Sequence, residues 1–219
     1  MNKIAAINGS PKANNSASGI LISQIEAIAE TTFTVYQAAK LIRQESISAA
    51  MADILNANVL LIVFPLYIDS LPAPVVKVLT LLEREAVKEG GQPPKVYSVC
   101  NCGFYEAENN RLALDIIRNF CVSAGLPWGY GIGIGAGGSI QSLSPNMSGG
   151  PMANVYAALC ELVESIRNHR SLQKNQFLTP EIPRSVYLSE ANKAWEQAAD
   201  KYGKKASLRA RPHTEKWMK

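Results

Sequence analysis

The sequence predicts an α/β fold, with a doubly wound five-stranded parallel sheet in strand order 2-1-3-4-5 and a helical carboxyl-terminal extension. Strand-like and helix-like segments alternate five times along the chain, as in sheets with helices on both faces. The continuous apolar run at 59–64 is typical of a central parallel strand. Right-handed crossovers leave few topologies for five such strands, and this order is the favoured one.

The five expected strands are short and rich in apolar or β-branched residues. The first, at 3–8, is almost wholly apolar, and the second, at 32–37, alternates as edge strands do. The third is the apolar run described above. The fourth is expected at 95–101 and the fifth at 128–135, where glycine occupies every second position. That glycine face is expected to lie against a helix backbone or a ligand.

Helices are expected wherever apolar residues recur at helical spacing. Those that belong to the sheet are predicted at 18–30, 48–56, 74–89, 106–125 and 152–170. In the fourth of these, Leu112, Ile116 and Phe120 are expected to face the core. The segment 173–183 is predicted to be a connector, and a last helix is expected at 188–202.

Length and composition limit the classes of protein. The chain has 219 residues and is 47% hydrophobic, which fits one folded α/β domain with a tail and excludes a disordered chain. No apolar run approaches the ~20 residues that a transmembrane helix needs. A strand pattern stands where a signal peptide would be. The four cysteines lack zinc or iron–sulfur spacing, so no metal site is expected, and the cytoplasm is the expected location.

The chain is expected to have two parts. Residues 1–170 would form the α/β ligand-binding domain, and 171–219 a helical extension with a basic tail. The net charge of +4 arises in that tail, where residues 201–219 hold seven Lys or Arg against one Glu. Basic tails can bind nucleic acid or anionic membranes, but most are solvated ends, so no nucleic-acid partner is expected.

The loop after the first strand is expected to bind a phosphate. It runs from Asn8 to Ser18 and leads into a helix, whose first turn presents unpaired N–H groups and the positive end of the helix dipole. Ser10, Ser16 and Ser18 add hydroxyl groups and Lys12 adds a charge. The loop has neither a Walker ending nor the glycines of a dinucleotide fingerprint, which favours a mononucleotide phosphate. An ordinary capped strand-to-helix turn is the alternative.

Two further loops are expected beside the first, because ligands of such sheets bind at the carboxyl ends of the strands. The loop at 65–72 offers Leu66 and Tyr67 beside a backbone stiffened by Pro65. The loop at 101–105 offers an amide side chain, two backbone amides and an aromatic ring, from Asn101, Cys102, Gly103 and Phe104. A flat heteroaromatic ring with a polar rim would suit these groups, and FMN fits that description.

Three motifs, in order along the chain, resemble those of a known family. The first is Asn8-Gly9-Ser10-Pro11-Lys12 followed by Ser16-Ala17-Ser18, the second is Pro65-Leu66-Tyr67, and the third begins Asn101-Cys102-Gly103-Phe104. The first two are similar to the phosphate and flavin loops of the NADPH-dependent FMN reductases, within the flavodoxin-like superfamily. The third resembles the N-C-G-F-x-E loop of a subgroup of flavodoxin-family NAD(P)H oxidoreductases. The resemblance covers roughly residues 1–170.

The resemblance implies a site for each part of FMN. It assigns the phosphate to Ser10, Lys12, Asn15, Ser16, Ala17 and Ser18. It places the ring near N5 beside Pro65, Leu66, Tyr67 and Ile68, with a backbone N–H of Tyr67 or Ile68 facing N5 and O4. It places the pyrimidine edge at Asn101, Cys102, Gly103 and Phe104. Lys12 stands where Arg is more usual, and it cannot form a planar bidentate clamp.

The resemblance also implies an activity and a partner. A hydride would pass from NAD(P)H through bound FMN to a small-molecule acceptor, such as a quinone, a nitro or azo compound, a flavin or a metal ion. Family members commonly dimerise through a helix like the one at 71–82, so a homodimer is expected. Packing of that helix into the core of its own chain is the alternative.

Other functions stay open at the level of the sequence. One is a flavodoxin-type electron-transfer protein that does not turn over nicotinamide, although the extra segments 137–151 and 173–219 disfavour it. Another is a non-enzymatic interaction module that uses the basic tail. The run Gly133–Gly138 matches G-x-G-x-x-G, but no helix pattern follows it as a dinucleotide fingerprint requires. This segment is instead expected to cover the flavin or to shape a substrate pocket.

Overall fold

The structure is a computed structural model that describes residues 3–12, 14–44, 47–86 and 92–201. The chain divides into two compact units, Met1–Glu181 and Ile182–Lys219. The first contains the sheet and the helices that cover it, and the second contains helix α8 (Arg184–Lys201). The predicted basic tail lies outside the described residues, apart from Lys201.

Six parallel strands form the sheet, in the order β2-β1-β3-β4-β5-β6. They are β1 (Ile4–Asn8), β2 (Thr34–Gln37), β3 (Val59–Pro65), β4 (Lys95–Asn101), β5 (Trp128–Ile134) and β6 (Gln176–Leu178). The first five strands have the predicted order. The prediction of five strands was wrong, because the segment expected to be a connector pairs with β5 as a sixth strand.

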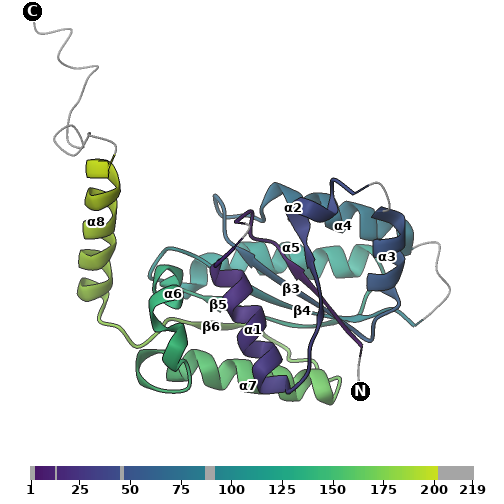
Figure 1. Cartoon of the computed structure of the whole chain (residues 1–219). Coiled ribbons are helices and arrows are strands. Elements are labelled where there is room, and N and C mark those ends of the chain that lie inside the picture. The colour runs from purple at the N-terminus through teal and green to yellow at the C-terminus, as the bar shows by residue number, and fades with distance from the viewer. Residues whose placement is uncertain (1–2, 13, 45–46, 87–91, 202–219) are drawn as a thin grey trace, which may run out of the picture. The chain divides into compact units, whose positions relative to one another are not determined.

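Helices cover both faces of the sheet (Figure 1). On one face lie α1 (Ala17–Ala29), α6 (Ile140–Leu143) and α7 (Ala153–Arg167). On the other lie α2 (Ala38–Leu41), α3 (Ile47–Leu55), α4 (Ala73–Ala86) and α5 (Arg111–Ser123). Four short 3-10 turns complete the unit: η1 (Ala107–Asn110), η2 (Gly137–Ser139), η3 (Ser144–Asn146) and η4 (Gly150–Met152). No helix in the described ranges has the length and apolar character that crossing a bilayer requires.

Strand β3 shows why the sheet is buried on both faces. Its apolar side chains alternate between the two cores, with Leu60 and Ile62 towards α3 and α4 and Leu61 and Val63 towards α1 and α7. All four are fully buried. Burial of each such side chain stabilises the fold by roughly 1.5–3 kcal/mol relative to exposure. Only a strand covered on both faces buries every residue of an uninterrupted apolar run, and β3 is such a strand.

Helix α5 buries a different stripe from the predicted one. The residues in the core are Ala113, Leu114, Ile117 and Cys121. Leu112 and Ile116, predicted to face inward, are 61% and 40% exposed, and Phe120 is only partly buried. Two apolar stripes with helical spacing run along this helix, and the sequence alone does not distinguish the stripe that faces the sheet.

The glycines of β5 lie against protein groups. A Cβ at Gly131 would lie 2.8 Å from Leu114 of α5, and one at Gly135 would lie 2.2 Å from the carbonyl oxygen of Tyr105. A register shift between β4 and β5 turns Gly129 away from this face, towards the Tyr97 ring. Close packing on α5 and on the chain before it therefore accounts for these glycines, and no ligand is needed there.

Candidate functional site

Three loops lie at the carboxyl ends of β1, β3 and β4. We call them loop 1 (residues 9–16), loop 2 (residues 66–72) and loop 3 (residues 102–106). Because β1 lies between β2 and β3, the chain reverses its direction across the sheet between loop 1 and loop 2. Ligands of doubly wound sheets bind at such a switch point.

The buried residue Asn101, at the end of β4, bonds to three elements that border the loops. Its Nδ2 donates to Ser18 Oγ at 3.2 Å and to the carbonyl of Phe64 at 3.1 Å. The backbone carbonyl of Asn101 accepts the N–H of Leu66 at 2.8 Å. Asn101 therefore links the start of α1, the end of β3 and loop 2, and both amide hydrogens are used within the protein.

Loop 1 is braced by its own side chains. Asn8 Oδ1 accepts the N–H of Ser10 at 3.0 Å, and Ser10 Oγ accepts the N–H of Lys12 at 3.2 Å. Side chains of Asn and Ser make such bonds two residues along the chain in tight turns. These two bonds fix the first part of the loop, from Asn8 to Lys12.

The loop ends at the N-terminus of α1, where several donors are unused. Ser16 is the N-cap, and its Oγ accepts the N–H of Gly19 at 3.0 Å. In the described part of the chain, the N–H groups of Ser16, Ala17 and Ser18 have no acceptor. The first turn of α1 carries no acidic side chain, so the positive end of the helix dipole is not neutralised there. An anion would satisfy these donors.

Three serine hydroxyls in loop 1 and the first turn of α1 share one hydrogen-bonding pattern. Ser10, Ser16 and Ser18 are 4%, 4% and 1% exposed, and the oxygen of each accepts a hydrogen bond from the protein. A hydroxyl that accepts a bond keeps its own proton to donate. With the exposed Lys12, these groups suit a phosphate, which has only acceptor oxygens.

Loop 2 contains a tight hairpin turn. The N–H of Tyr67 donates to the Ser70 carbonyl at 2.9 Å, and the reverse bond measures 3.1 Å. Ile68 and Asp69, between them, have φ of 49° and 56°, the left-handed pair that such a turn requires. A β-branched residue is strained there, and Ile68 is also 99% exposed. Because the N–H of Tyr67 is used inside the turn, Ile68 has the only N–H of the two that remains available in the described structure.

In loop 3, Cys102 is buried and the next residue, Gly103, is exposed. The N–H of Cys102 donates to Ile134, and its carbonyl accepts from Gly137 at 2.7 Å. Burial raises the pKa of the Cys102 thiol. Its Sγ lies 3.7 Å from the carbonyls of Phe104 and Glu106, to which it donates, and it accepts from Asn110 Nδ2 at 3.3 Å. Gly103, by contrast, is exposed, and a Cβ added there would meet nothing within 4 Å.

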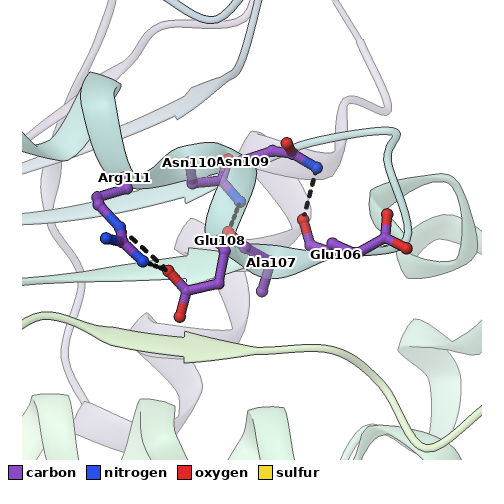
Figure 2. Close-up of polar contacts among 6 residues, drawn as sticks. All are labelled: Glu106, Ala107, Glu108, Asn109, Asn110 and Arg111. Carbon is purple, nitrogen blue, oxygen red and sulfur yellow. Dashed lines mark hydrogen bonds and ion pairs between the residues drawn. The ribbon is translucent and has the colours of Figure 1, made fainter.

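The segment that follows loop 3 is held together by bonds among its own residues, as Figure 2 shows. Asn110 is fully buried, and its Nδ2 donates to the Ala107 carbonyl at 2.9 Å. Asn109 Nδ2 donates to the Glu106 carbonyl at 3.1 Å, and Arg111 pairs with Glu108 at 2.6 Å. The 3-10 turn η1 thus carries the chain from loop 3 into α5.

Two residues that touch loop 1 were not predicted. Gln37, the last residue of β2, donates its Nε2 to the carbonyls of Ser10 and Lys12. Gln141 of α6 donates its Nε2 to the carbonyl of Asn15. The predicted strand order implies the position of Gln37, because strand two ends beside loop 1. No sequence signal indicates Gln141, which follows the G-x-G-x-x-G run in a helix of only four residues.

Two cavities lie away from the three loops. One of 390 Å³ opens at the amino end of β1, where Ile4 begins the strand and Glu30 ends α1. A second, of 220 Å³, lies between the ends of α3 and α5. At the three loops, the side chains of Tyr67 and Phe104 are 47% and 57% exposed. The described residues form no cluster of three or more His, Cys, Asp or Glu that could hold a metal ion.

Comparison with known proteins finds likeness at the level of the fold. No protein-family model matches the chain, and no curated protein matches its sequence. An apo structure titled NADH:FMN oxidoreductase is 18% identical with a TM-score of 0.57, over 79% of this chain and 92% of that one. A flavodoxin, WrbA-like protein from Agrobacterium tumefaciens is 12% identical with a TM-score of 0.53, over 78% and 100%.

A third structure is the general stress protein 14 from Treponema denticola in complex with FMN. It is 16% identical with a TM-score of 0.50, over 74% of this chain and 99% of that one. At these identities the likeness establishes the architecture rather than the chemistry. Together with the strand order, it confirms the fold expected from the sequence motifs: the chain has a flavodoxin-like α/β fold, with a sixth strand added to the sheet.

Proposed function

We propose that this protein is an FMN-dependent oxidoreductase that takes a hydride from NAD(P)H and reduces a small-molecule acceptor. The observation that carries the proposal is that a helix N-terminus with unused N–H donors, a strained hairpin and an exposed glycine loop lie at one switch point of the sheet. The FMN complex and the NADH:FMN oxidoreductase among the matched structures support it. When bound, FMN would supply the hydride chemistry, and the protein supplies position and electrostatics.

The phosphate of FMN would bind at loop 1 and the start of α1. The N–H groups of Ser16, Ala17 and Ser18 and the hydroxyl protons of Ser10 and Ser16 are the donors. Asn15 and Lys12, both exposed, complete the proposed set. Because Lys12 provides a point charge rather than a fork of donors, most of the directional bonds would come from the backbone.

The ring would lie over loops 2 and 3. Pro65, Leu66 and Tyr67 provide its apolar support, and the N–H of Ile68 would face N5 and O4. A donor at that position favours negative charge on the ring and so promotes its reduction. At the pyrimidine edge, Gly103 leaves room for close approach, with Phe104 beside it. Cys102 would act indirectly, because its backbone bonds to Ile134 and Gly137 hold loop 3 in place.

The expectations about partners stay predictions. Most apolar residues of the helix at 71–82, from which a homodimer was inferred, are buried in the chain's own core: Leu71, Val75, Val78, Leu79 and Leu82. Val76 of the same helix is 46% exposed, so a dimer through this helix would have to use that limited surface. The cytoplasmic location, the roles of the 1–170 and 171–219 segments, and the choice between NADH and NADPH likewise remain expectations from the sequence.

The test is an anaerobic reduction assay on the full-length protein loaded with FMN. Absorbance near 450 nm is followed after addition of NADH or NADPH, and an acceptor such as a quinone or an azo dye is then added. Rapid bleaching and its reversal by the acceptor are expected. Bound FMN that neither nucleotide reduces would favour the electron-transfer alternative, and a protein that does not bind FMN would exclude both.

A further inference from the structure

The carbonyl groups of loop 1 are held by two glutamines from outside the loop. Gln37 comes from β2 and Gln141 from α6, so the two side chains reach loop 1 from different elements. Each donates an amide N–H to backbone carbonyls and to no other recorded acceptor in the described residues. Neither residue belongs to the proposed set of FMN contacts.

Gln37 is positioned by strand pairing. It pairs with Asn8, the last residue of β1, so its side chain begins next to loop 1. Although Gln37 is the N-cap residue of α2, its side chain makes no capping bond. Its Nε2 instead donates to the carbonyl of Ser10 and, at 3.4 Å, to that of Lys12.

Gln141 serves the other end of the loop. Its Nε2 donates to the carbonyl of Asn15, the residue that precedes the N-cap of α1. Asn15 has φ of 50°, and this left-handed turn sets the direction in which the chain enters the helix. The segment after the G-x-G-x-x-G run thus contributes a side chain to the site, although it does not form a dinucleotide motif.

The two contacts matter because carbonyl oxygens and a phosphate repel each other. A peptide group that turns its carbonyl towards the bound anion presents the negative end of a dipole to it, and for the Asn15–Ser16 peptide this also removes the N–H of Ser16 as a donor. The Ser10–Pro11 peptide has no N–H, so there only the carbonyl matters. By engaging the carbonyls of Ser10, Lys12 and Asn15, the two amides would keep these peptide groups facing away from the anion. The N–H groups at the start of α1 would then face it unopposed.

We propose that Gln37 and Gln141 are positioning residues that make loop 1 selective for a phosphomonoester, and so for FMN over riboflavin. The inference rests on the proposed function, because it takes loop 1 as the phosphate site. It goes beyond that proposal in assigning the selectivity to two residues that do not touch the ligand. A purely structural role would change the affinity for both flavins equally.

The experiment measures dissociation constants for FMN and riboflavin by flavin fluorescence, on the full-length protein and on variants. Gln37→Leu and Gln141→Leu remove one donor each. Gln37→Glu keeps the shape but presents a carboxylate to the same carbonyls. Gln173→Leu is the matched control, because Gln173 is an exposed glutamine that precedes β6, and β6 is the edge strand farthest from β2. Melting temperatures identify any variant that does not fold.

Each Leu variant is expected to bind FMN about 3- to 10-fold more weakly, the usual effect of one lost hydrogen bond, with riboflavin affinity unchanged. Gln37→Glu is expected to lose more, and Gln173→Leu nothing. The inference would be overturned if the ratio of FMN to riboflavin affinity stays at the wild-type value in both Leu variants, whether neither affinity changes or both fall equally. Should Gln37→Leu fail to fold, Gln141→Leu, at an exposed position, decides the question. A wild-type protein that binds neither flavin would instead overturn the proposed function.

Discussion

Ile68 stands out among the individual residues, because its backbone conformation conflicts with its side chain. It has φ of 49° and a β-branched side chain that is 99% exposed, so no packing compensates for the strain. Strain of this kind costs of order 1–3 kcal/mol and clusters at functional sites. Its position at the tip of loop 2, with an available N–H, agrees with the proposed contact to the flavin ring.

Replacing Ile68 should separate stability from binding. In Ile68→Asn, the new side chain tolerates the left-handed region, so the free energy of unfolding in urea is expected to rise by about 1 kcal/mol. FMN affinity should stay near the wild-type value, because the backbone N–H is kept. Ile68→Val retains the β-branched strain and serves as the control, with no gain. A fall in stability for Ile68→Asn would show that the turn is not strained as described.

At the scale of elements, the start of α1 combines two roles in one residue. Ser16 caps the helix through its Oγ and offers the hydroxyl proton to the proposed phosphate. Glycine is a tolerable N-cap, whereas alanine is a poor one. The two substitutions therefore distinguish the capping role from the binding role.

Ser16→Ala is expected to lower the free energy of unfolding by about 1 kcal/mol, and Ser16→Gly by only a few tenths. Both should weaken FMN binding, by about 10-fold for one lost charge-assisted hydrogen bond. Chemical denaturation and flavin titration measure the two effects. Ser23→Ala, at an exposed position within the same helix, should change neither. Unaltered FMN affinity in Ser16→Gly would exclude the hydroxyl from the site.

Two glycines at the ends of β1 and β4 should respond in opposite ways. A Cβ at Gly9 would lie 2.5 Å from Val75 Cγ2 and 2.6 Å from Phe64 Cβ, so Gly9→Ala is expected to cost about 1–3 kcal/mol of stability. Gly103→Ala adds its methyl group to open space and should leave the melting temperature near the wild-type value. Its effect should instead be weaker FMN binding. A stable Gly9→Ala protein would contradict the described packing between loop 1 and α4.

The sequence predicted the elements with strong local signals and missed those that depend on tertiary contacts. The apolar run of β3 and the small-polar segment before α1 are local signals, so the sheet and the three loops could be placed. Strand β6 has only three residues, in a segment without a strand pattern, and exists because it pairs with β5. The face of α5 and the contact of Gln141 with Asn15 likewise depend on packing that the sequence does not encode locally.

For the molecule as a whole, the central question is which end of the strands binds the ligand. The three loops lie at the carboxyl ends of the strands, whereas a 390 Å³ cavity lies at the amino ends, near Phe33 and Val163. Strand order and the bonds of Asn101 favour the loops.

The most direct test is a titration of ¹⁵N-labelled full-length protein with FMN, followed by amide NMR. Saturable shifts are expected at Ser16, Ala17 and Ser18, at Ile68 and at Gly103, with no shifts at Phe33 or Val163. Riboflavin should shift Ile68 and Gly103 but leave the start of α1 largely unchanged. Shifts confined to the residues around Phe33 and Val163, or no shifts at saturating FMN, would contradict the assignment of the three loops as the flavin site.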